Sequence, residues 1–216
     1  MKTFATRGKA FDYWARNLKL NGIPYENTRA MFDVQFCILN PEPDDFPLYK
    51  TYSKDYEREE HMFYFKAERT VPENLLKYHL WKEVTDTNGK TWNNYGWHMH
   101  HGNQWQQIID LLKAEPHSRR AVLTLTDRKY EQYVIDMPCT AMVQFYILDN
   151  RLHTSVTMRS NDLFMGFCYD TKWWGHLVTI ALLTELREVH KTLELGHLIW
   201  KVTNFHIYEH HLDLID

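Results

Sequence analysis

Apolar and polar positions along the chain follow spacings that predict both helices and strands. Over residues 9–20 (KAFDYWARNLKL) apolar side chains recur at helical spacing, and the pair Asn21-Gly22 then ends the helix. A loop is expected over residues 40–47, which contain three prolines. Further helices are expected over residues 57–68, 104–114 and 171–190, the last of them long and buried.

Runs of residues that favour strands predict a sheet. The run RAVLTLT occupies residues 120–126, and two longer runs flank the turn pair Asp149-Asn150, which predicts an antiparallel hairpin. A last strand is expected over residues 196–210. Because no repeat and no linker-like stretch interrupts the pattern, we expect a single α+β domain over residues 1–216, with a mixed sheet packed by helices.

Composition and charge narrow the class of protein. Lys plus Arg is 25 and Asp plus Glu is 28, so a formal net charge of -3 leaves no positive excess for binding a nucleic-acid backbone. The charged N-terminus differs from a signal peptide, and no apolar run reaches the roughly 18 residues of a membrane helix. Three cysteines without CxxC spacing do not indicate a disulfide framework. We expect a cytoplasmic protein with no membrane partner and no direct nucleic-acid partner.

Cys139 is a candidate nucleophile, although a cysteine in a strand is more often a small buried apolar residue. A catalytic thiol needs cationic or polar neighbours that stabilise the thiolate. The predicted hairpin supplies them, because Arg159 and Ser160 on the return strand approach the start of the first strand. Arg119 and Arg120 form a second cationic pair, which together with the first could bind a phosphate or could simply be a solvated strand entrance.

The histidines of WHMHHG raise the question of a metal site. His98 and His100 alternate on one face if this stretch is a strand, but no third ligand has suitable spacing, and neither do His210 and His211 supply one. We therefore expect no metal. ATP and dinucleotide binding also have no support, because neither a P-loop nor a GxGxxG motif is present.

Several stretches, in one order, resemble motifs of the thymidylate synthase family. They are PCTAMVQF, MRSNDLFMGFCYD, NFHIYEHH, HSRRAV, NNYGWHMHHGNQW and EHMFYF. The resemblance covers about residues 27–211. It implies that this chain has the fold of the thymidylate synthase family. Within the family, the forms MRSND, NYGW and Cys139-Thr140 are most similar to the deoxycytidylate hydroxymethylases of T-even bacteriophages.

The resemblance implies roles for the reacting groups. Cys139 would attack C6 of a pyrimidine nucleotide, so that C5 becomes a nucleophile toward the methylene carbon of 5,10-methylenetetrahydrofolate, the co-substrate. Glu60 would manage proton transfers, unless it is a solvated helix residue beside Glu57 and Glu59. Asp170 occupies the position of the Asn that reads uracil, unless it only caps a helix before Thr171.

The donor and acceptor pattern at Asp170 favours cytosine. The family's Asn accepts from N3–H of uracil and donates to O4, whereas cytosine presents an acceptor at N3 and a donor at N4. A carboxyl group can accept from N4 and, when it shares a proton, can also bond N3. The sequence therefore predicts a dCMP-acting enzyme.

The resemblance also implies binding residues and a homodimer. The 5′-phosphate would be held by one chain's Arg29, Arg159 and Ser160 and by the partner's Arg119 and Arg120. The sugar would contact His206 and Tyr208, for which a core His and Tyr pair is the alternative. Asp162 would contact the pterin, Trp81 and Tyr95 would line the pocket, and Lys50 is a candidate for the lysine that contacts folate.

Departures from the family pattern distinguish possible products. Thr140 replaces a His, Val202-Thr203-Asn204 replaces a Gly-Asp pair, and Cys168-Tyr169 replaces Pro-Phe. The sequence stops at Asp216, without the tail that closes the site over the folate, and an open site should admit water. We therefore expect a dCMP hydroxymethylase. The alternatives are a dCMP methyltransferase, a dUMP-acting synthase and a non-catalytic nucleotide-binding relative.

Overall fold

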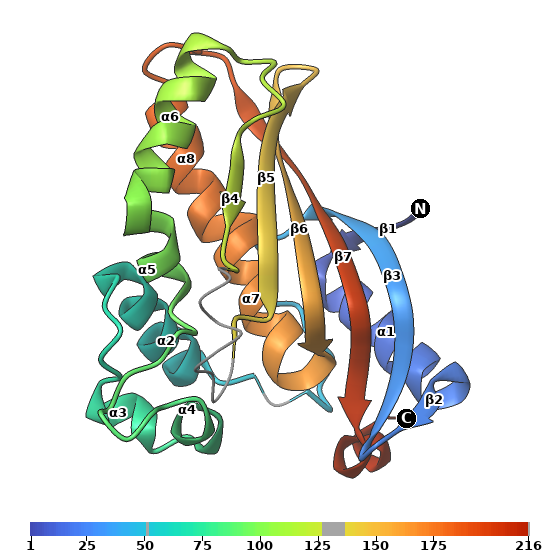
Figure 1. Cartoon of the computed structure of the whole chain (residues 1–216). Helices are drawn as coiled ribbons and strands as arrows, with labels where there is room; N and C mark the ends of the chain where they lie inside the picture. Colours follow the sequence, from blue (N-terminus) through green and yellow to red (C-terminus); the bar gives the residue numbers. More distant parts are fainter. Residues whose placement is uncertain (51, 127–136, 216) are drawn as a thin grey trace.

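The computed structural model describes residues 1–50, 52–126 and 137–215, and in this part of the chain seven strands form one mixed sheet (Figure 1). The strand order is β1-β3-β7-β6-β5-β4, with β2 paired to β3. The strands are β1 (Lys2–Thr6), β2 (Ile23–Tyr25), β3 (Thr28–Asn40), β4 (Val122–Thr124), β5 (Thr140–Leu148), β6 (Arg151–Asp162) and β7 (Glu194–Tyr208). The pairs β1–β3 and β6–β7 are parallel and the others are antiparallel, so the expected α+β class with a mixed sheet is confirmed.

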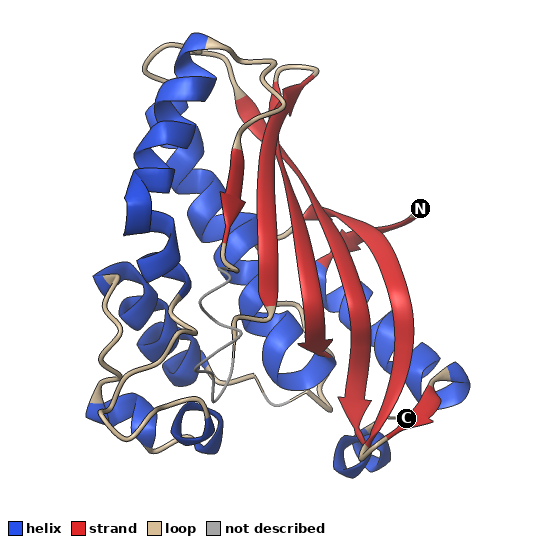
Figure 2. Ribbon diagram, in the orientation of Figure 1, coloured by secondary structure: helices blue, strands red, loops and turns tan. Residues whose placement is uncertain are grey.

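Helices pack against the sheet (Figure 2). They are α1 (Arg7–Asn21), α2 (Lys54–Lys66), α3 (Glu73–Leu76), α4 (His79–Glu83), α5 (Tyr95–His100), α6 (Gln104–Ala114), α7 (Cys168–Lys172) and α8 (Thr179–Leu186). Helix α1 and the segment around α7 share one core, in which Trp14 contacts Phe36 and Phe205, and Phe167 contacts the same two rings. Among the described residues no helix is both long enough and apolar enough to cross a bilayer.

Several predicted elements are confirmed. Helix α1 contains the expected helix and ends at Gly22, whose N–H bonds the carbonyl of Leu18, and α6 has the expected bounds. The predicted hairpin is β5 and β6, with Asp149 and Asn150 at φ values of 51° and 57°, as a two-residue hairpin turn requires. The expected last strand is β7.

Other expectations need correction. The stretch with His98 and His100 is helix α5 and not a strand, because the Asn94 side chain accepts from the N–H of Trp97 and starts a helix. The helix expected over residues 171–190 is part of a longer helical segment that includes α7 and α8 and ends at Leu186. Two π-helical segments, Leu163–Phe167 and Trp173–Val178, flank α7.

Candidate active site

Most of the predicted site residues lie at one end of the sheet, where β6 and β7 end and β3 and β5 begin (Figure 1). Cys139 directly precedes β5, and its carbonyl oxygen accepts from the backbone N–H of Arg159 at 2.9 Å. Across the sheet, Asp162 is paired with His206, and Thr28 is paired with Tyr208. The register of four strands therefore collects residues from both halves of the chain.

Arg159 supplies positive charge beside the candidate nucleophile. Its guanidinium donates to the carbonyl oxygens of Met137 (2.6 Å) and Pro138 (3.2 Å), the two residues before Cys139. Cys139 itself is half-buried. The hairpin thus brings the cation to the start of the first strand, as its turn and length predicted.

Glu60 is buried on α2, with a relative exposure of 5%, and is not a solvated helix residue. The Tyr56 hydroxyl donates to Glu60 Oε1 at 2.6 Å, and the indole N–H of Trp81 in turn contacts the Tyr56 oxygen at 3.2 Å. Burial raises the pKa of Glu60 to about 8, against the hydrogen bond from Tyr56 and with the charge of Asp170. At neutral pH this carboxyl group therefore holds a proton that it can give to a substrate.

Asp170 lies inside α7 and does not cap it, so the alternative of a helix cap is wrong. Asn161 Nδ2 donates to Asp170 Oδ2 at 2.9 Å, while Asn161 Oδ1 accepts from the indole N–H of Trp200 at 3.2 Å. Burial raises the pKa of Asp170 to about 7, although hydrogen bonds from Tyr95 and Asn161 oppose the shift. Asn161 was missed by the sequence analysis, although it stands between two predicted site residues.

Tyr95, on α5, interacts electrostatically with Asp170, Cys139 and Glu60. It is buried and packs against Trp174, with ring centroids 5.3 Å apart. Burial raises its pKa, and the charges of Asp170, Cys139 and Glu60 raise it further. The charges of all three predicted catalytic side chains therefore act on one phenol.

Thr140, which replaces the His of the family pattern, is fixed in the core. Its hydroxyl accepts from the indole N–H of Trp174 at 3.1 Å and contacts the Met158 sulfur at 3.1 Å. The side chain has no exposed surface. Thr140 is therefore held in the core directly after Cys139.

The predicted phosphate residues fall into two separate groups. Arg29 lies on β3 in the group at the Cys139 end of the sheet, where it donates to the carbonyl of Gly22 at 3.3 Å. The carbonyl of Arg119 accepts from Gln144, five residues after Cys139, which at about 3.4 Å per residue corresponds to about 17 Å along β5. Arg120 is exposed and forms an ion pair with Glu115 at 2.7 Å.

The two sugar-contact candidates lie beside each other on β7. His206 Nδ1 is 3.0 Å from Asn204 Oδ1, and the His206 and Tyr208 rings meet edge to face at 5.5 Å. Both side chains are half-buried. Asn204 therefore fixes the orientation of the His206 ring.

Asp162 has a buried acceptor that no described residue uses. Its Oδ2 accepts from the N–H of Met165 at 2.6 Å, whereas its buried Oδ1 has no partner among the described residues. His211 Nδ1 is likewise buried without a partner there, and its ring stacks on Phe164 at 4.4 Å. The Lys50 ammonium lies 5.8 Å from the same Phe164 ring, so this candidate lysine lies near the ring on which His211 stacks. This combination suits a flat, anionic ligand that carries N–H donors.

No metal site competes with this assignment in the described ranges. Within residues 1–50, 52–126 and 137–215, no group of three or more His, Cys, Asp and Glu side chains is arranged to hold a metal ion. His211 instead belongs to the group around Asp162, and His98 Nε2 contacts the carbonyl of Trp92 at 2.7 Å.

The comparisons with known proteins identify the class. The family model described as thymidylate synthase matches residues 25–216, and the chain belongs to that family. The chain is similar to the thermostable thymidylate synthase A from Bacillus subtilis, with a TM-score of 0.70 and 21% identity over 95% of this chain and 81% of that one. The expected thymidylate synthase-like fold is thereby confirmed.

The curated relatives are enzymes with two different activities. The chain is 32% identical over 149 residues to deoxycytidylate 5-hydroxymethyltransferases of Enterobacteria phages T4 and T2, which is 63% of this chain and 59% of each relative. It is also 31% identical over 147 residues to a thymidylate synthase of Corynebacterium aurimucosum, covering 64% of this chain and 53% of the relative. The matches therefore span less than two thirds of the relatives' own length.

Proposed function

We propose that this chain is a transferase that hydroxymethylates C5 of dCMP, with 5,10-methylenetetrahydrofolate as the co-substrate. Membership of the thymidylate synthase family supports one-carbon transfer to a pyrimidine nucleotide. The observation that supports cytosine as the base is a buried carboxyl group at Asp170 whose pKa is about 7.

Asp170 can read cytosine because its two oxygens differ. Oδ2 accepts from Asn161 Nδ2 and, when the carboxyl group is neutral, carries the proton that is donated to N3 of cytosine. Oδ1 accepts from the N4 amino group. Uracil presents the opposite pattern and would face two mismatched groups. A pKa near 7 keeps the required protonated form populated at neutral pH.

The chemistry then follows from Cys139 and Glu60. The Cys139 thiolate adds to C6, and the electron pair of the C5–C6 double bond moves to C5. The folate supplies the methylene carbon that C5 attacks. Loss of the C5 proton and departure of the folate leave an exocyclic methylene, which takes hydroxide from water as the S–C6 bond breaks. Glu60, protonated at neutral pH, supplies and recovers protons during these steps.

A complete phosphate site requires a second copy of the chain. Arg119 is about 17 Å along β5 from Cys139, so Arg119 and Arg120 do not join Arg159 and Ser160 in one protomer. In a homodimer each protomer supplies the two arginines to the partner's site. Four arginines around one phosphate then give charge-assisted, bidentate contacts.

The identity of the product tests the proposal. The protein is incubated with dCMP and methylenetetrahydrofolate, and the nucleotide is weighed by mass spectrometry, with dUMP as a parallel substrate. We expect a mass gain of CH₂O on dCMP and none in a Cys139→Ser control. A gain of CH₂ would identify a dCMP methyltransferase instead. Conversion of dUMP alone would refute the cytosine assignment.

A further inference from the structure

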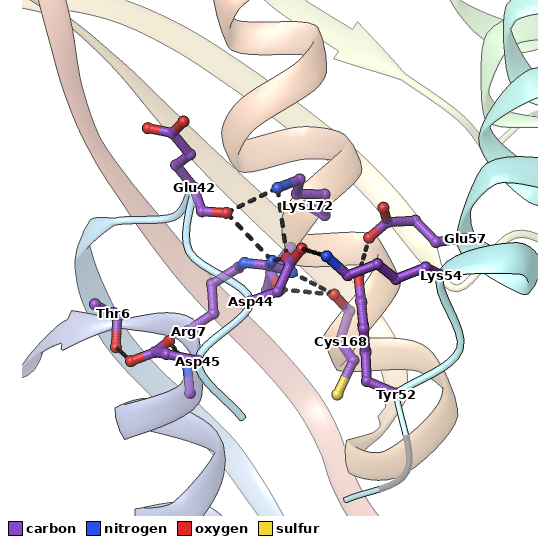
Figure 3. Close-up of polar contacts among 12 residues, drawn as sticks. Thr6, Arg7, Glu42, Asp44, Asp45, Tyr52, Lys54, Glu57, Cys168 and Lys172 are labelled. Atoms are coloured by element: carbon purple, nitrogen blue, oxygen red, sulfur yellow. Dashed lines mark hydrogen bonds and ion pairs between the residues drawn. The ribbon is translucent and has the colours of Figure 1, made fainter. Parts of the chain in front are cut away.

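Arg7, the first residue of α1, is a fully buried cation that the proposed chemistry does not use. Its side chain has 0% relative exposure. Nη1 donates to the carbonyl of Cys168 at 2.6 Å, and Nη2 forms an ion pair with Asp44 (Figure 3). Burial lowers its pKa, and the charge of Asp44 opposes that shift. A buried arginine is tolerated only where such partners satisfy it.

The contacts of Arg7 converge on the short helix that carries Asp170. Cys168 is the first residue of α7, and Lys172 is the last. Lys172 Nζ donates to the carbonyl of Glu42 at 2.8 Å and lies 3.4 Å from Asp44 Oδ1 (Figure 3). Both ends of α7 are therefore tied to the loop that contains Glu42 and Asp44.

That loop is itself fixed to the start of α1. The Asp45 carboxylate accepts from the Thr6 hydroxyl at 2.6 Å and from the N–H of Gly8 at 3.1 Å. Residue 8 must be glycine here, because a Cβ atom would clash with the Asp45 carbonyl. The loop thus provides a rigid base for the two contacts with α7.

Helix α7 needs this support. It has five residues and lies between two π-helical segments, whose wider turns interrupt the regular α-helical hydrogen bonds. A helix this short has little stability of its own, so tertiary contacts set its position. A displacement of Asp170 by about 1 Å would break hydrogen bonds to a base, a misplacement that typically lowers activity by about 100-fold.

We infer that Arg7, together with Asp44 and Lys172, is a positioning group that holds α7 so that Asp170 meets the pyrimidine base. The inference rests on the proposed function, in which Asp170 reads the base. Arginine suits this position because Nη1 and Nη2 each bond a different acceptor, the Cys168 carbonyl and Asp44, whereas a lysine offers one nitrogen on a shorter side chain. Arg7 touches neither the nucleotide nor the folate.

The test measures base selectivity, which a purely structural role would leave unchanged. Arg7→Lys keeps the charge but has one nitrogen on a shorter side chain in place of Nη1 and Nη2, so it cannot keep both bonds in their present geometry. Lys172→Met removes the contacts of a side chain with 14% exposure at the other end of α7. The measurements are kcat/KM for dCMP and for dUMP, and Tm. We expect the dCMP-to-dUMP ratio to fall by about 10-fold or more in both variants.

Two controls separate positioning from stability. Asn150→Ala removes the side-chain bond to the Thr192 carbonyl at the far end of the β5–β6 hairpin and places alanine at a φ of 57°, so Tm should fall and the selectivity ratio should remain. Lys54→Met removes an exposed cation 3.9 Å from Asp44 and should change neither. If Arg7→Lys and Lys172→Met keep the wild-type ratio while Tm falls as in Asn150→Ala, the inference is wrong.

Failure of the proposed function would look different. It would appear in the wild-type protein as a preference for dUMP or as no turnover of either nucleotide. With a dUMP preference, the same variants still test Arg7, because a misplaced Asp170 must reduce whichever selectivity the wild type has. Without turnover, the ratio of dissociation constants for the two nucleotides replaces kcat/KM, and an unchanged ratio in both variants again overturns the inference.

Discussion

Replacement of Asp170 by Asn tests how this chain selects its base. The substitution keeps the size of the side chain, so the fold and the phosphate residues should persist. Asn161 Nδ2 faces Asp170 Oδ2 at 2.9 Å, and Asn161 cannot turn over without losing its bond from Trp200. An amide at position 170 will therefore direct its oxygen toward Asn161 and its NH₂ group toward the base.

The structure sets the size of the expected change. The NH₂ group would face N4 of cytosine, donor against donor, and no proton remains for N3. Each buried polar group that faces a wrong partner costs about 1–3 kcal/mol. Two such positions correspond to a change of about two to four powers of ten in relative kcat/KM, which is within the range that polar recognition achieves. The same NH₂ group can donate to O4 of uracil.

The assay is kcat/KM for dCMP and dUMP in the wild type and in Asp170→Asn, with the folate saturating. We expect the variant to lose activity on dCMP and to gain activity on dUMP. Circular dichroism and Tm check that the variant is folded. A variant that is folded and still prefers dCMP would show that Asp170 is not the base-reading residue.

Three further predictions concern the other site residues. Cys139→Ser should abolish turnover and leave the dissociation constant of dCMP within about 2-fold, because only the covalent step is lost; substantial turnover would refute the nucleophile. Arg120→Ala and Arg119→Ala should each weaken dCMP binding by about 1.5–3 kcal/mol. Mixing either variant with Cys139→Ser should restore activity in heterodimers. No recovery would place the arginines in their own protomer's site. Glu60→Gln should be more stable than wild type at high pH. The pKa of Glu60 is about 8 in the folded protein and 4.5 in the unfolded chain, so the stability that its neutral form contributes is fully present below pH 4.5 and is lost as the pH rises through about 8. The difference in unfolding free energy should approach about 5 kcal/mol near pH 9 as an upper bound, and urea titrations at several pH values that show equal stabilities would contradict it.

The sequence predicts those elements whose signals are local. The bounds of α6 and the β5–β6 hairpin follow from apolar spacing and from a turn pair that accepts positive φ. The long strand β3 was missed because apolar residues follow one another along it, as at Phe36, Cys37 and Ile38, all three of which are buried. Such a run hides the period of two, although the pairing with β7 keeps a single register along the strand.

The burial of Glu60 was accessible from the sequence, but that of Arg7 was not. Glu60 follows Tyr56 by four residues and precedes Phe63 by three, so it shares the face of α2 that carries buried aromatic rings. That spacing distinguishes it from Glu57 and Glu59. Arg7 binds groups 37 and 161 residues away, and no local pattern reports partners so distant in the chain.

The spacing between Cys139 and Gln144 along β5 supports a dimer. Cys139 precedes the strand at one end, and Gln144 holds the carbonyl of Arg119 further along, so the rigidity of one strand keeps the two cationic groups apart. No rearrangement of side chains spans about 17 Å, since an extended Arg side chain covers less than half of that distance. In an isologous dimer, an arginine that reaches the partner's site implies that the partner's arginine reaches back. Both sites are then completed by the same contact, and dilution below the dimer dissociation constant should remove nucleotide affinity and activity together.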